Sequence, residues 1–110
     1  MSNRLDQLLQ FLERSPNEPF LLFAIAKEYE NSQQLSQALT YYTELIEKHA
    51  DYVGTYYHLG KLHEQEQRFA EAFHTYKQGM QIARQQGDQH ALSELAGAKL
   101  NLGDDEDFED

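Results

Sequence analysis

The chain repeats itself with a period of 34 residues, and this period constrains the fold more than any other feature of the sequence. Shifting the sequence by one period aligns five identical pairs, which are Lys27/Lys61, Glu30/Glu64, Gln33/Gln67, Ala38/Ala72 and Tyr42/Tyr76. The apolar positions around these pairs also agree in size. Identity and matched size together indicate two copies of one structural unit.

Within each copy the apolar spacing is helical. In the first copy, Leu22, Ile25, Ala26 and Tyr29 fall at positions i, i+3, i+4 and i+7, which form one face of a helix. The segment 35–46 has the same spacing, and the short polar segment 31–34 lies between the two. This pattern predicts two antiparallel helices joined by a tight turn.

The residues that carry this pattern resemble the tetratricopeptide repeat. The second copy has Tyr56-x-x-Leu59-Gly60-x-x-His63, followed by Ala72-x-x-x-Tyr76. In that family a large residue precedes Leu-Gly, a Tyr follows, and small and aromatic residues recur in the second helix. The proline that usually closes each unit is present as Pro16 before the first copy, but Ala50 and Arg84 replace it afterwards. Short stand-alone bacterial proteins of this family are similar to the whole chain.

The resemblance implies an all-α fold of antiparallel helix-turn-helix repeats, stacked as a short right-handed α-solenoid. We expect about six helices, near residues 3–14, 18–31, 35–49, 53–67, 69–86 and 88–101. These would form a single domain over residues 1–102. Its parts would be a leading helix (3–16), two repeats (17–50 and 51–84) and a capping helix (88–102).

Composition excludes several classes of protein. The chain has no cysteine, so disulfides and thiolate metal sites are impossible. No apolar run approaches the ~18 residues that a membrane span needs. The net charge of −10 disfavours binding to nucleic acid. Residues 1–10 lack a basic region followed by an apolar stretch, so we expect a cytoplasmic protein.

The resemblance also implies a place for a partner, because tetratricopeptide arrays bind on the concave face lined by the first helix of each pair. Carried over by position, the predicted groove residues are Phe20, Phe23, Lys27, Glu30, Asn31, Tyr57, His58, Lys61, Glu64 and Gln65. Aromatic anchors beside a few charges suit a peptide-binding groove. Alternatively, the aromatic residues pack against the leading helix or against another copy of the chain.

One known specialisation of the family does not fit. Some members grip a partner's C-terminal carboxylate through a set of Lys and Asn residues. Here Phe23, His58 and Leu92 stand where Lys, Asn and a basic residue would be expected, although Lys27 and Lys61 remain. We therefore do not expect binding of that type.

Catalysis and metal binding find little support in the sequence. There is no phosphate-binding loop and no nucleophile motif. His90 and Glu94 are four residues apart and could share a helix face, but we find no third ligand near them. His63 occupies the packing position usually held by Tyr. We therefore predict a protein that is not an enzyme and has no cofactor or metal.

The C-terminal segment 103–110 is a separate feature. Its acidic residues at 104–107, 109 and 110 carry six of the ten net negative charges, which leaves −4 on residues 1–103. Such runs repel themselves, so we predict a disordered, solubilising tail. Alternatively, the tail docks on the Lys27/Lys61 groove with Phe108 as its apolar anchor.

The predicted function is an adaptor or scaffold that binds a peptide or protein surface in its groove. The alternative is a self-assembling structural protein, because two repeats bury little apolar surface on their own and a second copy could cover the rest. Neither function involves nucleic acid or a membrane.

Overall fold

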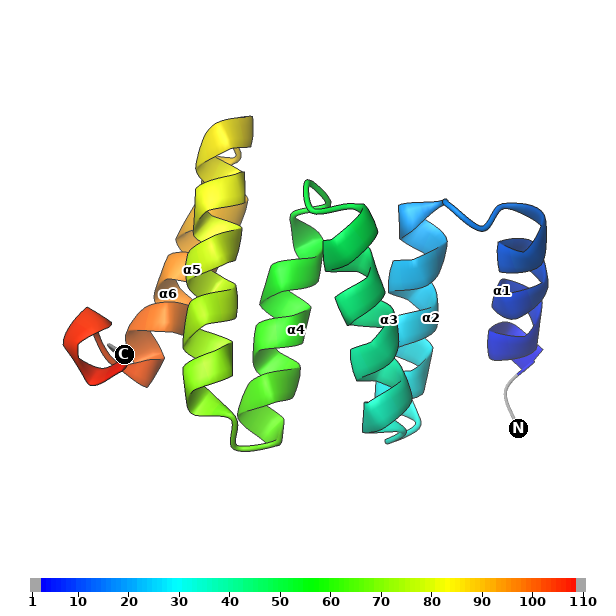
Figure 1. Ribbon diagram of the computed structural model, residues 1–110, viewed down its shortest axis with the longest axis horizontal. Coiled ribbons are helices and arrows are strands. Elements are labelled where there is room, and N and C mark those ends of the chain that lie inside the picture. Colours follow the sequence, from blue (N-terminus) through cyan, green and yellow to red (C-terminus); the bar gives the residue numbers. More distant parts are fainter. Residues whose placement is uncertain (1–2, 109–110) are drawn as a thin grey trace. The chain divides into compact units, whose positions relative to one another are not determined.

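The computed structural model describes residues 3–108, and within that range it contains six α-helices and one short 3-10 helix (Figure 1). The elements are α1 (Asn3–Arg14), α2 (Pro19–Asn31), α3 (Leu35–Lys48), α4 (Gly54–Gln65), α5 (Phe69–Gln86), α6 (Gln89–Leu102) and η1 (Asp105–Phe108). The all-α helical repeat fold predicted from the sequence is confirmed. No helix begins or ends more than two residues from its predicted boundary.

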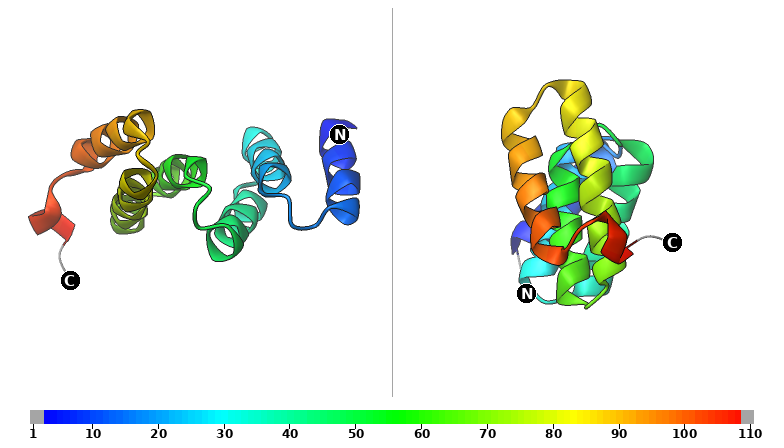
Figure 2. Two further views of the ribbon diagram at one scale, coloured as in Figure 1. Left: turned by 90° about the horizontal axis from the view of Figure 1, so that it is seen from above. Right: turned by 90° about the vertical axis from the view of Figure 1, so that its left-hand side faces the viewer.

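The helices group into two compact units, Met1–Tyr52 and Val53–Asp110. The prediction of one continuous domain over residues 1–102 stays a prediction. In the first unit α2 and α3 form an antiparallel pair, and α1 packs on α2 (Figures 1 and 2). The core of this unit is apolar and fully buried, and it consists of Leu21, Leu22, Ile25, Ala26, Ala38, Tyr42 and Leu45.

The second unit has the same antiparallel pair in α4 and α5, and α6 packs along α5 (Figures 1 and 2). Its core contains Tyr56, Leu59, Leu62, Ala72, Phe73, Tyr76, Met80, Ala83, Leu95 and Ala98. Gly60 is essential to the close approach of the pair, because a Cβ atom at this position would overlap the ring of Tyr76. Asp88 caps α6, with its carboxylate accepting a hydrogen bond from the Ala91 amide at 3.0 Å.

One identical pair of the repeat, Gln33/Gln67, is exposed and lies where helices α2 and α4 turn into the next helix. Both residues adopt left-handed backbone angles, with φ of 62° and 59°. In each case the next amide donates to a carbonyl five residues earlier, Gln34 to Tyr29 and Arg68 to His63, both at 2.8 Å. Gly87 (φ 68°) ends α5 in the same way. The three turns are therefore one type of helix C-cap, and only Gly87 has the residue that this backbone favours.

The structure describes residues 103–108 of the tail, for which the sequence predicts disorder. Residues 105–108 form η1, and the preceding turn is closed by reciprocal hydrogen bonds between backbone and side chain. The Asp107 carboxylate accepts from the Asp104 amide at 2.9 Å, and the Asp104 carboxylate accepts from the Glu106 amide at 3.1 Å. This arrangement resembles a capping box, which satisfies amides at the start of a helix. The last two positions of the predicted disordered tail, 109 and 110, lie outside the described residues.

The Gln67 turn generates a stability prediction. A non-glycine residue in the left-handed region costs roughly 1–2 kcal/mol, whereas glycine adopts this region freely but loses more entropy on folding. We expect Gln67→Gly to raise the free energy of unfolding by about 0.5–1 kcal/mol. Gln81→Gly, on an exposed position within α5, should lower it by about 1 kcal/mol. Urea denaturation followed by circular dichroism measures both, and a destabilised Gln67→Gly variant would contradict the role assigned to this turn.

Candidate functional site

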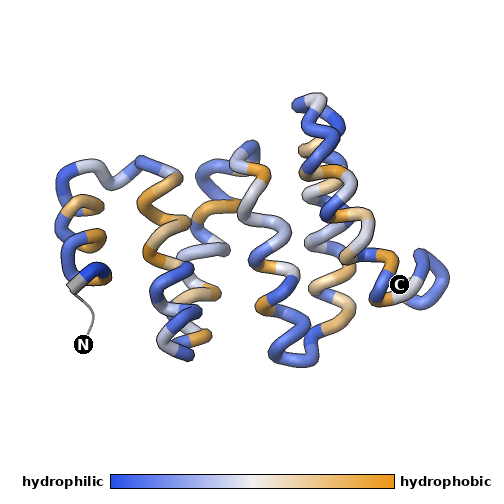
Figure 3. The backbone as a smooth tube through the Cα atoms, turned by 180° about the vertical axis from the view of Figure 1, so that it is seen from behind, coloured by the Kyte–Doolittle hydropathy of each residue, from blue (hydrophilic) through white to orange (hydrophobic). Residues whose placement is uncertain are grey.

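The predicted groove residues of the first unit lie on one side of α2 and are accessible to different degrees. Phe20 and Asn31 are exposed, whereas Phe23, Lys27 and Glu30 are half-buried. Figure 3 shows that the first part of α2 is mainly hydrophobic and its last turn mainly hydrophilic. This helix therefore presents an aromatic end and a charged end within a few turns.

Phe23 is anchored more firmly than the sequence suggested. Its ring makes an edge contact with Tyr42, with centroids 6.1 Å apart, and a tilted contact with Tyr52 at 5.8 Å. Both partners belong to the first unit. Phe23 therefore joins the aromatic packing of the unit while keeping part of its ring accessible, so its replacement would disturb the fold as well as the surface.

The charged end of α2 is organised around Glu30. The buried hydroxyl of Tyr42, on α3, donates to Oε1 of Glu30 at 2.7 Å. Lys27 Nζ lies 3.8 Å from the same oxygen. The carboxylate thus ties the two helices of the pair together and holds a lysine one turn away on the surface. Glu30 is consequently a structural partner of Tyr42, which the sequence analysis did not foresee.

The second unit repeats this arrangement on α4. The hydroxyl of Tyr76 donates to Oε2 of Glu64, and Lys61 Nζ lies 3.8 Å from that oxygen. The ammonium group of Lys61 also lies 5.5 Å from the ring centroid of Tyr57, within the range of a cation–π contact. Four of the five predicted residues on α4 are half-buried and Gln65 is exposed.

Aromatic contacts fix Tyr57 in place. Its ring lies against His58, with centroids 5.6 Å apart, and against Tyr76 at 6.4 Å. Tyr57 occupies the position of Phe23 in the repeat, and each of the two rings contacts the buried tyrosine of its own unit. Each unit therefore offers the same surface elements, namely an anchored aromatic ring and a lysine held by a glutamate. These elements suit contact with carboxylates and apolar groups of another molecule.

Two of the histidines, His63 and His74, lie close together on the surface of the second unit. Burial lowers the pKa of the His63 imidazole; Glu71 opposes this shift and Arg68 adds to it. His63 and His74 line a shallow surface depression with Glu71. Across residues 3–108, however, no group of three or more His, Asp or Glu side chains is arranged to hold a metal ion. Nor is any helix in this range long and apolar enough to cross a bilayer.

A second surface, between α1 and α2, was missed by the sequence analysis. This depression is lined by Leu8, Phe11, Arg14, Ser15, Glu18, Phe20 and Leu21. Phe11 and Phe20 are 51% and 56% exposed, which is high for phenylalanine. The available signal was Phe11, which widens the apolar face of the first helix beyond what a single neighbouring helix covers.

The comparisons with known proteins agree with this architecture. Residues 53–86 match the family model of the tetratricopeptide repeat. The crystal structure of a tetratricopeptide repeat domain protein from Salinibacter ruber is 48% identical, with a TM-score of 0.74, and the match covers 77% of this chain and 96% of that one. A solution structure of such a protein from the same organism is also 48% identical, with a TM-score of 0.77 and coverage of 80% and 89%.

A protein from Bordetella parapertussis, solved in solution, shares the fold at 23% identity, with a TM-score of 0.80 over 99% of this chain and 95% of that one. A search of curated proteins finds no match. The likeness to the Salinibacter proteins covers nearly their full length, so it extends well beyond the repeat at residues 53–86.

The buried tyrosines generate a prediction about alkaline pH. Burial raises the pKa of Tyr76, and so does the hydrogen bond to the Glu64 carboxylate; burial and Glu30 act in the same way on Tyr42. Above the usual tyrosine pKa of about 10, the unfolded chain loses these protons while the folded chain retains them. The contribution of these two hydroxyl groups to the free energy of unfolding therefore has its full value below about pH 10 and falls as the pH rises further.

We expect Tyr76→Phe to reduce the decrease in the free energy of unfolding by about 1.4 kcal/mol per pH unit. The reason is that the folded and unfolded chains then differ by one bound proton fewer. Free energies of unfolding, measured in urea at intervals from pH 9 to 12, test this. Identical slopes for wild type and variant would show that the hydroxyl is not protected as described.

Proposed function

Because the chain belongs to the tetratricopeptide repeat family, we propose that it is a protein–protein interaction module, an adaptor or scaffold, that binds through the predicted groove residues of α2 and α4. Its partner is a peptide or a protein surface that carries carboxylates beside apolar side chains. The proposal includes no catalytic activity. The observation that carries it is the pair of repeat-matched lysines, Lys27 and Lys61, each beside a glutamate that a buried tyrosine anchors.

The anchoring supports binding for an energetic reason. A lysine side chain on a helix surface is flexible and loses rotamer freedom when it engages a partner. Here the glutamate is fixed by its tyrosine and attracts the lysine at 3.8 Å, so part of this ordering precedes binding. A preorganised cation beside an accessible ring is the kind of site on which binding energy concentrates.

Self-assembly is the alternative function, and one observation favours it. The exposed rings of Phe11 and Phe20 share the depression between α1 and α2, where a second copy of the chain could cover them. Light scattering over a range of concentrations separates the two functions. A mass that rises with concentration in wild type, and stays monomeric in Phe11→Glu, would favour self-assembly over adaptor function.

Charge reversal of the lysines tests the adaptor function. Pull-downs from the native lysate would use wild type, Lys27→Glu and Lys61→Glu, followed by affinity measurements with the protein that wild type retains. We expect each reversal to weaken binding by at least about tenfold, which corresponds to ~1.4 kcal/mol.

Lys48→Glu on α3 and Arg84→Glu on α5 make the same charge change at exposed positions of each unit, and they serve as controls for net charge. All variants should match wild type in helicity by circular dichroism. A partner retained equally by all five proteins would place the binding surface away from α2 and α4 and contradict the proposal.

A further inference from the structure

The tail is bound to the second unit through a small surface formed by Phe73 and Lys77 on α5 and by Lys99 on α6. We refer to these three residues as the tail-binding surface. Phe108 stacks on Phe73, with ring centroids 4.5 Å apart and ring planes inclined by 22°. Phe73 itself is only 1% exposed. The tail thus adds an aromatic ring to the edge of the core.

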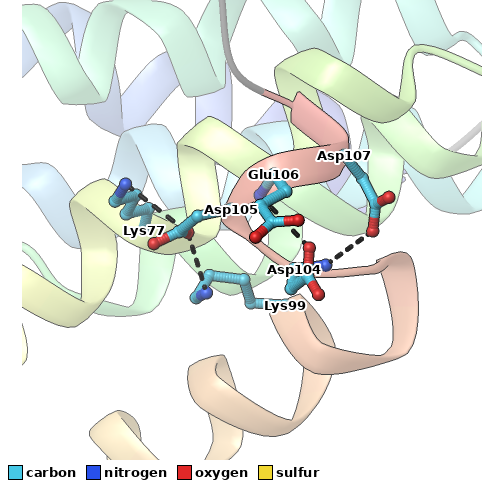
Figure 4. A network of polar contacts seen from close by, with 6 residues as sticks. All are labelled: Lys77, Lys99, Asp104, Asp105, Glu106 and Asp107. Carbon is cyan, nitrogen blue, oxygen red and sulfur yellow. Dashed lines mark hydrogen bonds and ion pairs between the residues drawn. The ribbon is translucent and has the colours of Figure 1, made fainter.

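The same surface provides the charges that match the tail. Oδ1 of Asp105 lies 3.6 Å from Lys77 Nζ and 3.5 Å from Lys99 Nζ, so two ammonium groups converge on one carboxylate (Figure 4). The Lys99 ammonium also lies 4.7 Å from the ring centroid of Phe73. A cationic pair beside an aromatic ring is therefore already assembled on α5 and α6.

The geometry of η1 explains which tail residues engage this surface. Residues three apart in a 3-10 helix project from the same side, so Asp105 and Phe108 point together. Two hydrogen bonds, from the Asp104 amide to the Asp107 carboxylate and from the Glu106 amide to the Asp104 carboxylate, fix the turn at the start of η1. The recognised feature is thus an aspartate followed three residues later by phenylalanine, within an acidic segment.

The strength of this contact is modest. The Asp105 side chain is 62% exposed and that of Lys77 is 55% exposed, and ion pairs of this kind contribute about 0–1 kcal/mol. An aromatic stack adds roughly 0.5–1.5 kcal/mol. A short connection to α6 offsets this weakness in part, because it gives the tail an effective concentration in the millimolar range. A competing segment of similar chemistry can therefore displace it.

We propose that the tail-binding surface is a second peptide-binding site, specific for acidic segments with the pattern Asp-x-x-Phe. The chain's own tail is its resident ligand and competes with any partner that carries such a segment. This site is distinct from the faces of α2 and α4. Its chemistry also differs, because one of the two stacked rings, that of Phe108, belongs to the ligand and the other, that of Phe73, to the surface.

The test uses the full chain and a fluorescein-labelled peptide with the sequence of residues 103–110. In the released variant, Asp105→Lys together with Phe108→Ala, the tail loses its ion pairs and its ring, which leaves the surface open. Fluorescence polarisation should show that this variant binds the peptide about twofold more tightly than wild type, in which the tethered tail competes at millimolar effective concentration. Glu106→Lys makes the same charge change as Asp105→Lys at a tail position outside the Lys77 and Lys99 ion pairs, and should behave like wild type.

Further substitutions in the released variant locate the peptide. Lys99→Glu should weaken binding by tenfold or more, while Lys99→Arg retains it and shows that the surface is intact. Lys61→Glu should have no effect, which separates this site from the face of α4. A peptide with alanine in place of its phenylalanine should bind at least tenfold more weakly.

Three results would overturn the inference. One is equal affinity of wild type and the released variant, including the absence of binding to both. Another is equal binding of the peptide that lacks phenylalanine. The third is loss of binding on Lys61→Glu but not on Lys99→Glu, which would assign the peptide to the α4 face instead.

Discussion

The structure depends on one interaction, the burial of a tyrosine between the two helices of each pair. Tyr42 and Tyr76 have no exposed surface, and the ring of Tyr76 lies against Gly60, which has no side chain and so allows the two helices to approach. Ala26, a small buried residue, occupies the matching position of the first unit. A buried hydroxyl needs a hydrogen-bond partner, because leaving it unsatisfied costs about 1–3 kcal/mol. Glu30 and Glu64 supply that partner from the neighbouring helix. One tyrosine thus fixes the spacing of the pair by its ring and the register of the pair by its hydroxyl.

This interaction also connects the fold to the surface on which function is proposed. Each glutamate accepts the tyrosine hydroxyl and attracts a lysine on the same helix, so the position of the surface cation follows from the packing of the core. The anchored rings of Phe23 and Tyr57 contact the same tyrosines. The residues that best suit binding are therefore neighbours of those that stabilise each unit, and the repeat preserves both sets together.

The fold could be predicted from the sequence because its determinants are periodic. The spacing of apolar residues located all six helices, and the pairs Ala38/Ala72 and Tyr42/Tyr76 revealed the packing positions. The identity of Gln33 and Gln67 could not be explained from the sequence, because the spacing of apolar residues does not indicate where a glutamine adopts left-handed backbone angles. The role of Glu30 was missed because its partner lies twelve residues away on another helix. The contacts of the tail were missed because net charge was considered without the Asp104–Asp107 turn or the nearby lysines.

A double-mutant cycle between Tyr76 and Glu64 tests the central interaction most directly. Free energies of unfolding would be measured for wild type, Tyr76→Phe, Glu64→Met, which has a similar length but no oxygen acceptor, and the double variant. If the hydroxyl and the carboxylate stabilise the helix pair through each other, the cycle will give a coupling free energy of about 1–2 kcal/mol. Effects that add, with a coupling free energy near zero, would show that the two residues act independently and would contradict the account.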